Sequence, residues 1–311
     1  MNARSEPAMI APGEHIDGFT VGALRHTGAQ GAIYDVAGPG TVPLIMKVPR
    51  IDPGTEQAEA LIAYEVETMI MPELRGRHVP RFVAAGDLAT TPYIVMERIE
   101  GTGLAALAPP LDVESVTRLG AAIADALHDV HRQDTIHLDL KPDNIIVRPD
   151  GSVVLIDFGL AHHARLPDLL AEEQRFAAGS SPYISPEQVQ GNRTDPRSDV
   201  FALGVILYEL ATGALPYGTP ETIAGMRDRL WLDPEPPASR NRAVPAWLQE
   251  VIPRCLEADA TKRYQSAAHV AFDLRNPQQI VITERGTRAK SARLGTRVRR
   301  WFGTRSERRT A

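Results

Sequence analysis

The sequence predicts an α+β protein of two unequal lobes, a small β-rich lobe followed by a larger helical lobe. Between residues 19 and 97, five short runs of strand type surround one helical stretch at 56–71. After Gly103, apolar residues recur at helical spacing along 113–132, and beyond Glu187 the chain is mostly helical. With 311 residues, of which 43% are hydrophobic and 23% charged, the chain is long enough to bury a sizeable core.

The elements follow from local patterns. The strands of the small lobe are expected at 18–23, 32–36, 44–48, 82–85 and 93–97. The apolar stripe of the helix at 113–132 consists of Val116, Leu119, Ile123, Leu127 and Val130. Two further short strands are expected at 145–148 and 153–156, on either side of a Pro-Asp-Gly turn. The resulting organisation is a leader (1–14), a small lobe (15–95), a connection with the large lobe (96–275) and a tail (276–311).

Charge divides the chain at the start of the tail. The net charge is −5, but residues 276–311 carry +8, which leaves −13 for residues 1–275. An acidic body excludes a protein that coats nucleic acid with its whole surface. Cys255 is the single cysteine, so intrachain disulfides and cysteine metal clusters are excluded. The first 14 residues lack a secretory signal, and the longest apolar run, 200–208, is too short to span a membrane, so we expect a cytoplasmic protein.

Two polar segments carry the strongest chemical signal. One is HLDLKPDN, residues His137 to Asn144, and the other is the Asp-Phe-Gly that begins at Asp157. Phosphoryl transfer needs a carboxylate to orient the attacking hydroxyl, a cation beside the moving phosphate and oxygen ligands for magnesium. The segments supply these residue types in Asp139, Lys141, Asn144 and Asp157. The alternative is a charged surface loop, which the second segment, thirteen residues beyond Asn144, disfavours.

These segments resemble those of the eukaryotic-type serine/threonine protein kinases of bacteria, and the resemblance covers roughly residues 19–275. It implies a two-lobed protein kinase fold with an ATP cleft between the lobes, and ATP and Mg²⁺, with Mn²⁺ as an alternative, as cofactors. It also implies transfer of the γ-phosphoryl group to Ser or Thr of proteins, the chain itself included. In this family Asp139 would be the base, Lys141 would stabilise the transferring phosphoryl, and Asn144 and Asp157 would hold the metal. His137, Phe158 and Gly159 complete the two motifs in structural roles.

The resemblance also assigns the nucleotide-binding residues. The glycine-rich loop would be formed by His26, Gly28, Gly31 and Ile33, with His26 in place of the family's first glycine. Lys47 would grip the phosphates, and because an unpaired ammonium in an apolar strand is costly, it needs a carboxylate partner. Glu65 is the expected partner and Glu67 the alternative. Adenine would be held at Met96, Glu97 and Ile99, with Ile146 also against the nucleotide.

Downstream, residues 179–187 resemble the substrate-docking segment that ends in Ser-Pro-Glu. Glu187 is expected to pair with Arg263, and Asp199 to hold the catalytic loop. The Lys141-Pro142 step and this segment favour a protein kinase over a small-molecule phosphotransferase, which remains one alternative. A nucleotide-binding pseudokinase scaffold remains the other.

Two departures from the family pattern concern regulation and partners. The family's usual arginine before the catalytic aspartate is Leu138, and residues 157–179 contain no Ser, Thr or Tyr. We therefore expect a kinase without the usual activation-loop phosphorylation switch. The basic tail is interpreted as a solvated extension, as a segment that binds an anionic membrane surface or an acidic partner, or as an inhibitor folded onto the body; nucleic acid is less favoured.

Overall fold

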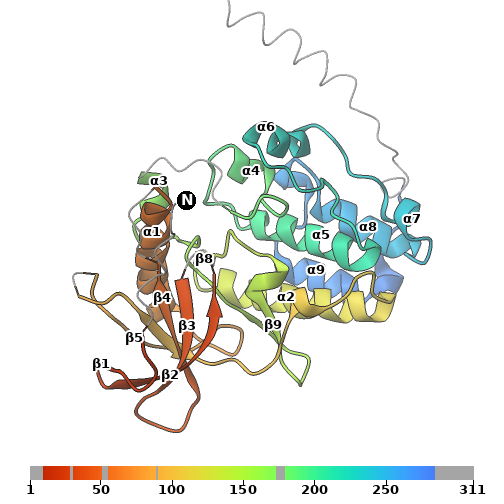
Figure 1. Ribbon diagram of the computed structural model, residues 1–311. Helices are drawn as coiled ribbons and strands as arrows, with labels where there is room; N and C mark the ends of the chain where they lie inside the picture. The colour runs from red at the N-terminus through yellow and green to blue at the C-terminus, as the bar shows by residue number, and fades with distance from the viewer. Residues whose placement is uncertain (1–9, 29–30, 51–54, 89, 173–178, 284–311) are drawn as a thin grey trace, which may run out of the picture.

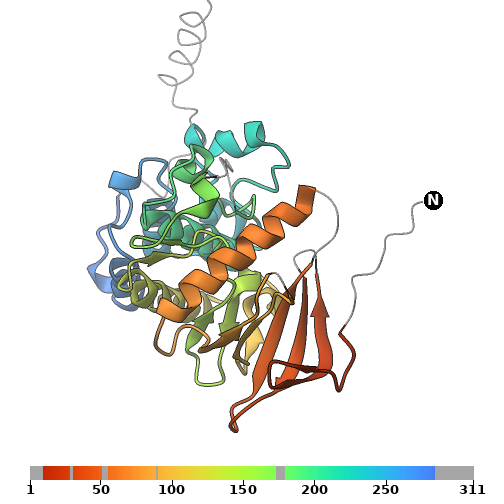
Figure 2. The same ribbon diagram turned by 90° about the vertical axis from the view of Figure 1, so that its left-hand side faces the viewer.

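The computed structural model describes residues 10–28, 31–50, 55–88, 90–172 and 179–283. The small lobe is a curled six-stranded sheet with the order β1-β2-β3-β4-β6-β5, and neighbouring strands are antiparallel (Figure 1). Its strands are β1 His15–Ile16, β2 Phe19–Thr27, β3 Gly31–Ala37, β4 Leu44–Pro49, β5 Phe82–Ala85 and β6 Ile94–Glu97. The helix α1 Thr55–Ile70 crosses in front of this sheet (Figure 2).

The alternation of side chains along the strands gives the sheet two different faces. Tyr34 of β3 lies opposite Met46 of β4, and both are buried in the core of the small lobe. Ile33 and Lys47 are the next pair along, so they point to the other face. Lys47 is thereby placed on the face that α1 covers, while its flanking residues Met46 and Val48 pack in the apolar layer behind the sheet.

The large lobe is built on long helices. These are α2 Val113–His131, α5 Arg197–Thr212, α8 Ala246–Cys255 and α9 Ala267–Arg275. The helix α2 packs against α5 and α9, and α5 packs against α8 (Figure 1). Almost all of α5 is buried, and it ends at Gly213, whose positive φ of 71° reverses the chain. The short helices are α3 Leu169–Glu172, α4 Pro186–Val189, α6 Ile223–Met226 and α7 Pro237–Arg240.

Small strands line the junction between the lobes. They are β7 Thr102–Gly103, β8 Thr135–Ile136, β9 Ile145–Val147, β10 Val153–Leu155 and β11 His162–His163. The sheet β10-β9-β7 and the pair β11-β8 hold the polar segments of the sequence close to the small lobe. In this way the loop that follows Ile136 and the loop that follows Leu155 come together.

The α+β two-lobed architecture and the helix and strand positions are confirmed, most of them within a few residues. The first long strand is longer than predicted, since β2 continues to Thr27. The start of the predicted tail lies against the large lobe, where the amide and hydroxyl of Thr283 donate to Glu250 at 2.8 and 2.7 Å. Residues 1–9 of the expected leader and 284–311 of the tail lie outside the described residues.

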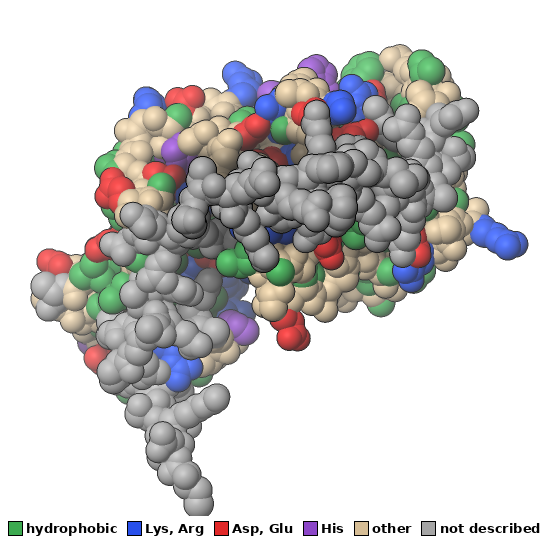
Figure 3. Space-filling view, turned by 90° about the horizontal axis from the view of Figure 1, so that it is seen from above, with side chains coloured by type: hydrophobic (Ala, Val, Ile, Leu, Met, Phe, Trp, Pro, Cys, Tyr) green, Lys and Arg blue, Asp and Glu red, His purple; other side chains and the backbone are tan. Residues whose placement is uncertain are grey.

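Two further features concern the described part of the chain as a whole. No helix in the described part of the chain is long and apolar enough to cross a membrane. Seen from above, acidic and basic side chains are interspersed over the described part of that face (Figure 3). The negative charge of the body does not gather there into one patch.

Candidate active site

The carboxylate of Asp199 holds the backbone of the catalytic loop, the segment of residues 137–144. This carboxylate lies near the start of α5, is buried, and accepts the amides of His137 and Leu138, each at 2.9 Å. His131 Nε2 lies 2.8 Å from Oδ2, the same oxygen that accepts the amide of His137. Burial by itself would raise the pKa of Asp199, but these contacts outweigh it and lower the pKa. A charged carboxylate therefore holds the backbone at Leu138, the residue before Asp139, in a left-handed conformation with φ 60°.

Asp139 is the centre of a polar cluster. Its Oδ2 accepts Lys141 Nζ at 2.8 Å and Asn144 Nδ2 at 3.1 Å, and its Oδ1 accepts the amide of Ser180 at 2.7 Å. Lys141 Nζ also donates to Ser180 Oγ at 2.8 Å. The catalytic loop and the docking segment, about forty residues apart in sequence, are thus joined at the carboxylate. The sequence-predicted Asp139, Lys141 and Asn144 are brought together, and Ser180 is an addition that sequence reasoning did not single out.

A second cluster joins the lobes, and here the expectation for Glu65 is wrong. Lys47 Nζ donates to Glu67 Oε2 at 2.6 Å and to Asp157 Oδ1 at 2.8 Å. Glu67 is 1% exposed, whereas Glu65 is only partly buried. The two glutamates are two residues apart on α1, which is about 200° around a helix, so only one can face Lys47.

The Asp-Phe-Gly turn is locked against α1. Glu67 Oε1 accepts the amide of Phe158 at 3.2 Å, and the Phe158 ring lies 4.9 Å from that of His137. Burial opposes the charge of Lys47, but Glu67 and Asp157 outweigh it and raise the pKa of Lys47. For Asp157 burial is likewise outweighed, mainly by Lys47, and its pKa is lowered. Both groups are therefore charged at neutral pH.

The residues expected from the sequence to form the glycine-rich loop lie on β2 and β3 and directly after β2. His26 pairs with Ile33 across β2 and β3. Gly31 has a φ of 156°, and a Cβ there would lie 2.1 Å from the carbonyl oxygen of Val48, so no side chain fits. Gly28 follows β2, and residues 29 and 30 of the loop lie outside the described residues.

The residues that the sequence suggests for adenine lie at the connection between the lobes. Met96 lies opposite Ile45 of β4 and is buried, and the amide of Glu97 is taken by the carbonyl of Arg81. Within the part of the chain that the structure describes, the amide of Ile99 has no hydrogen-bond partner, which leaves it available to a ligand. Ile146 lies on β9 opposite Gly103, on the large-lobe side of this connection.

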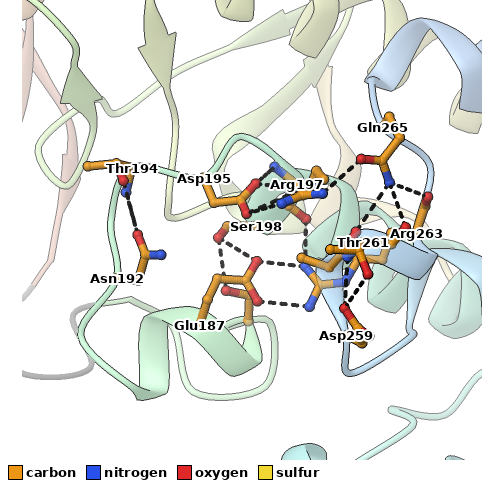
Figure 4. A network of polar contacts seen from close by, with 12 residues as sticks. Glu187, Asn192, Thr194, Asp195, Arg197, Ser198, Asp259, Thr261, Arg263 and Gln265 are labelled. Carbon is orange, nitrogen blue, oxygen red and sulfur yellow. Dashed lines mark hydrogen bonds and ion pairs between the residues drawn. The ribbon is translucent and has the colours of Figure 1, made fainter.

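The docking segment is fixed by a buried ion pair. Arg263 donates to Glu187 through both terminal nitrogens at 2.6 and 2.8 Å, as expected from the sequence, and Ser198 Oγ adds a bond to Glu187 (Figure 4). Both ion-pair residues are buried, and the pairing is of the strong two-point kind. A nearby hydrogen bond joins this segment to the catalytic loop: Gln188 Nε2 donates to the carbonyl of Leu138 at 2.7 Å.

A second buried arginine, Arg229, was missed by sequence reasoning. It is 1% exposed and donates to the carbonyls of Ser181 and Ile184 of the docking segment. Its guanidinium also lies 5.5 Å from the centre of the Tyr217 ring. Burial, with no carboxylate partner among the described residues, lowers the pKa of Arg229 to about 10. An isolated Arg in the Arg-Asp-Arg stretch has no periodic signal that would have identified it.

The residues present fit a magnesium ion. Asp157 provides carboxylate oxygens, and Asn144 uses its amide nitrogen on Asp139, so its amide oxygen is the atom left for a cation. Hard cations such as Mg²⁺ prefer oxygen ligands and commonly take only one or two from the protein, with phosphate and water supplying the rest. No cluster of three or more His, Cys, Asp or Glu side chains suited to a metal occurs among the described residues.

Comparison with known proteins agrees with this geometry. The family described as protein kinase domain matches residues 27–273. Serine/threonine-protein kinase Pkn1 of Myxococcus xanthus is 38% identical over 200 residues, 62% of this chain and 28% of that protein. PknB of Mycobacterium leprae is 34% identical over 187 residues, 59% of this chain and 30% of that one. The matches thus span about a third of the length of the curated relatives.

In fold, the chain is similar to the crystal structure of a mutant PknI kinase domain from Mycobacterium tuberculosis. The TM-score is 0.64 at 22% identity, and the match covers 87% of this chain and 99% of that one. Because the family matches well over half of the sequence, this chain belongs to the protein kinase domain family.

Proposed function

We propose that the chain is an ATP-dependent protein serine/threonine kinase. The observation that carries the proposal is the Asp139 cluster, because one carboxylate is bonded both to a cation, Lys141, and to Ser180 of the docking segment. A protein acceptor bound along that segment would present its hydroxyl beside Asp139. The relatives named as serine/threonine-protein kinases support the acceptor class.

The chemistry follows from the positions of the charged groups. Asp139 orients the acceptor hydroxyl and takes its proton as the hydroxyl oxygen bonds to the γ-phosphorus. The bond from that phosphorus to the bridging oxygen breaks, and ADP leaves. Lys141, 2.8 Å from Asp139, stabilises negative charge on the group in transfer, and Lys47 holds the phosphates of the nucleotide. A magnesium ion held by Asn144 and Asp157 would neutralise phosphate charge and orient the nucleotide.

We further propose that this activity does not require phosphorylation of residues 157–179. Leu138, where the family has arginine, is buried and cannot receive a phosphate, and no hydroxyl side chain occurs in that stretch. The pair of Lys47 with Glu67 and the contact of Phe158 with α1 are both present in the unmodified chain. Fully active protein is expected to carry no phosphate between residues 157 and 179, as checked by mass spectrometry of the same sample.

The test of the activity is direct. Purified chain is incubated with labelled ATP, Mg²⁺ and a general protein substrate, next to Asp157→Asn. We expect label on Ser and Thr with the unmodified chain and none with the variant. Absence of label from the unmodified chain, with nucleotide binding retained, would indicate a scaffold; label on a small molecule but not on protein would indicate a small-molecule phosphotransferase.

For the basic tail we propose binding to an acidic surface, either anionic lipid or an acidic protein. Residues 284–311 hold ten Arg or Lys against two Glu, and Trp301 and Phe302 lie among them. Cosedimentation with vesicles of anionic lipid, compared with neutral vesicles and with a chain ending at Thr283, tests the lipid case. Equal binding by the shortened chain would exclude the tail as the cause.

A further inference from the structure

A buried arginine outside the catalytic motifs grips the segment that follows the Asp-Phe-Gly turn. Arg193 lies just after α4, and its side chain is 7% exposed. Its Nη2 donates to the carbonyls of Leu160 and Ala161 at 3.0 and 3.3 Å. Its Nε lies 3.1 and 3.0 Å from the two carboxylate oxygens of Asp168. One guanidinium therefore joins the chain just after α4 to two points of the segment that begins at Asp157.

Asp168 is the acidic partner and is also the residue from which α3 starts. Its Oδ1 accepts the amide of Ala171 at 3.3 Å, and its carbonyl accepts the amides of Ala171 and Glu172. His162 Nδ1 lies 3.4 Å from Oδ2, a contact that becomes an ion pair when the imidazole is protonated. The contacts of Asp168 with His162 and Arg193 outweigh the effect of burial and lower its pKa to about 2, so the carboxylate is charged.

The helix that Asp168 starts is next to α1. The structure places α3 in contact with one end of α1 (Figure 1). At the other end of the gripped stretch, Gly159 packs so closely on α1 that a Cβ would lie 3.0 Å from Cβ of Ala63. Leu160 and Ala161 follow Gly159 directly. Arg193 thus holds both ends of this stretch, one through the carbonyls of Leu160 and Ala161 and the other through its ion pair with Asp168. Both ends lie next to α1, which carries Glu67 to Lys47.

We infer that Asp168 and Arg193 are positioning residues that hold this segment in its catalytically competent place, in the role that a phosphorylated side chain and the catalytic-loop arginine would otherwise fill. The inference rests on the proposed kinase activity. A guanidinium binds a carboxylate and a phosphate through the same kind of charge-assisted hydrogen bonds. The chain lacks both usual partners: Leu138 stands where the family has the catalytic-loop arginine, and residues 157–179 contain no hydroxyl side chain that could be phosphorylated. Instead, the carboxylate of Asp168 supplies a permanent negative charge, and Arg193, which follows the docking segment in the chain, supplies the guanidinium.

The test compares the unmodified chain with Asp168→Asn, which keeps the size of the side chain and removes its charge, and with Arg193→Gln, which shortens the side chain and removes the guanidinium. Arg165→Gln is the matched control, because Arg165 lies on the same segment but its ion pair with Asp134 is exposed, with side-chain exposures of 69% and 55%. For each protein, kcat and the KM for ATP are measured with saturating protein substrate. Thermal unfolding and hydrogen exchange of the amides in 157–172 and in α1 are measured in parallel.

We expect kcat to fall about tenfold in Asp168→Asn and Arg193→Gln, while Arg165→Gln stays within about twofold. The KM for ATP should change less than kcat, because the loss lies in the fraction of molecules that are competent. Exchange should quicken in 157–172 and α1 while the amides of α5 stay protected. The effects of the two substitutions should not add in the double variant, since each removes the same ion pair.

Several results would overturn the inference. If Asp168→Asn keeps full kcat while the unmodified chain is active, the kinase proposal stands and the positioning role fails. A loss of kcat that merely parallels a drop in folded fraction would assign the pair to stability alone. Should the variants not fold, exchange in the unmodified chain decides: fast exchange at 160–172 in unphosphorylated, active protein contradicts the inference, and slow exchange supports it. Inactivity of the unmodified chain would instead contradict the kinase proposal itself.

Discussion

Replacing Glu67 by Gln is expected to lower the proposed kinase activity strongly, whereas the same replacement at Glu65 is expected to change it little. The two residues carry the same side chain two positions apart on α1, so the comparison holds helix propensity and charge constant. Glu67 Oε2 lies 2.6 Å from Lys47 Nζ, and its other oxygen accepts the amide of Phe158. Glu65 is only partly buried, and its charge takes part in no ion pair within the described residues.

The magnitude follows from what each variant leaves behind. The neutral amide introduced by Glu67→Gln cannot neutralise Lys47, but Asp157 remains 2.8 Å from that ammonium, so the lysine is not left unpaired. The loss is therefore that of one charge-assisted bond, about 1.5–3 kcal/mol, rather than that of a fully orphaned buried charge. If the bond is needed in the transition state, kcat/KM falls about 10- to 100-fold. Without a bond to lose, Glu65→Gln should stay within about twofold.

The assay is steady-state phosphorylation of a protein substrate at varied ATP, with thermal unfolding followed for each variant. We expect Glu67→Gln to lower kcat/KM for ATP while the protein remains folded. Equal losses in the two variants would refute the assignment of Glu67, as would full activity of Glu67→Gln. A loss confined to Glu65→Gln would reinstate the partner that the sequence pattern favoured.

Three further predictions concern other parts of the site. Asp139→Asn should lower kcat by about 10²–10⁴ with nucleotide binding retained, as measured by turnover and by binding of an ATP analogue; unchanged kcat would remove Asp139 as the base. Arg229→Met should raise the KM for protein substrate severalfold and leave that for ATP unchanged, because Arg229 holds the carbonyls of Ser181 and Ile184; the exposed neighbour Arg227→Met is the control. The pKa of Asp168 is lowered from 3.8 to about 2, so its contribution to the free energy of unfolding is complete above about pH 4 and is lost as the pH falls towards 2. In acid unfolding, the free energy of unfolding of the unmodified chain should therefore exceed that of Asp168→Asn by about 1 kcal/mol, after solvent screening, and this difference should disappear at about pH 2. A difference that does not change with pH would contradict this.

The fold was predictable because its signals are local and repeated. Strand alternation, the helical stripe on α2 and the Pro-Asp-Gly turn each occupy a few consecutive residues, and the structure places the elements there. That Asp139, Lys141 and Asn144 come together was predictable for a similar reason, since the three residues lie within six positions of the chain.

The partner of Lys47 could not be settled from the sequence. Glu65 and Glu67 differ only in their direction from α1, and that direction depends on the rotation of the helix about its axis. The rotation is fixed by packing against the sheet and by the amide of Phe158, ninety-one residues from Glu67. Arg193 and Arg229 were missed for a related reason, because each acts on backbone carbonyls that any sequence would supply.

The contacts divide the site into a fixed half and an adjustable half. The loop that carries Asp139 is held by hydrogen bonds to Asp199 and Gln188, and the docking segment is held by the ion pair of Glu187 and Arg263. These groups all belong to the large lobe and are buried. Lys47 instead pairs with Asp157 across the lobes and with Glu67 of α1 in its own lobe, so its contacts depend on the placement of α1. The large lobe touches α1 through Phe158, Gly159 and α3. In a chain without hydroxyl groups at 157–179, the residue that determines whether α3 and its neighbours stay in place is Asp168, encoded in the sequence and charged at every physiological pH.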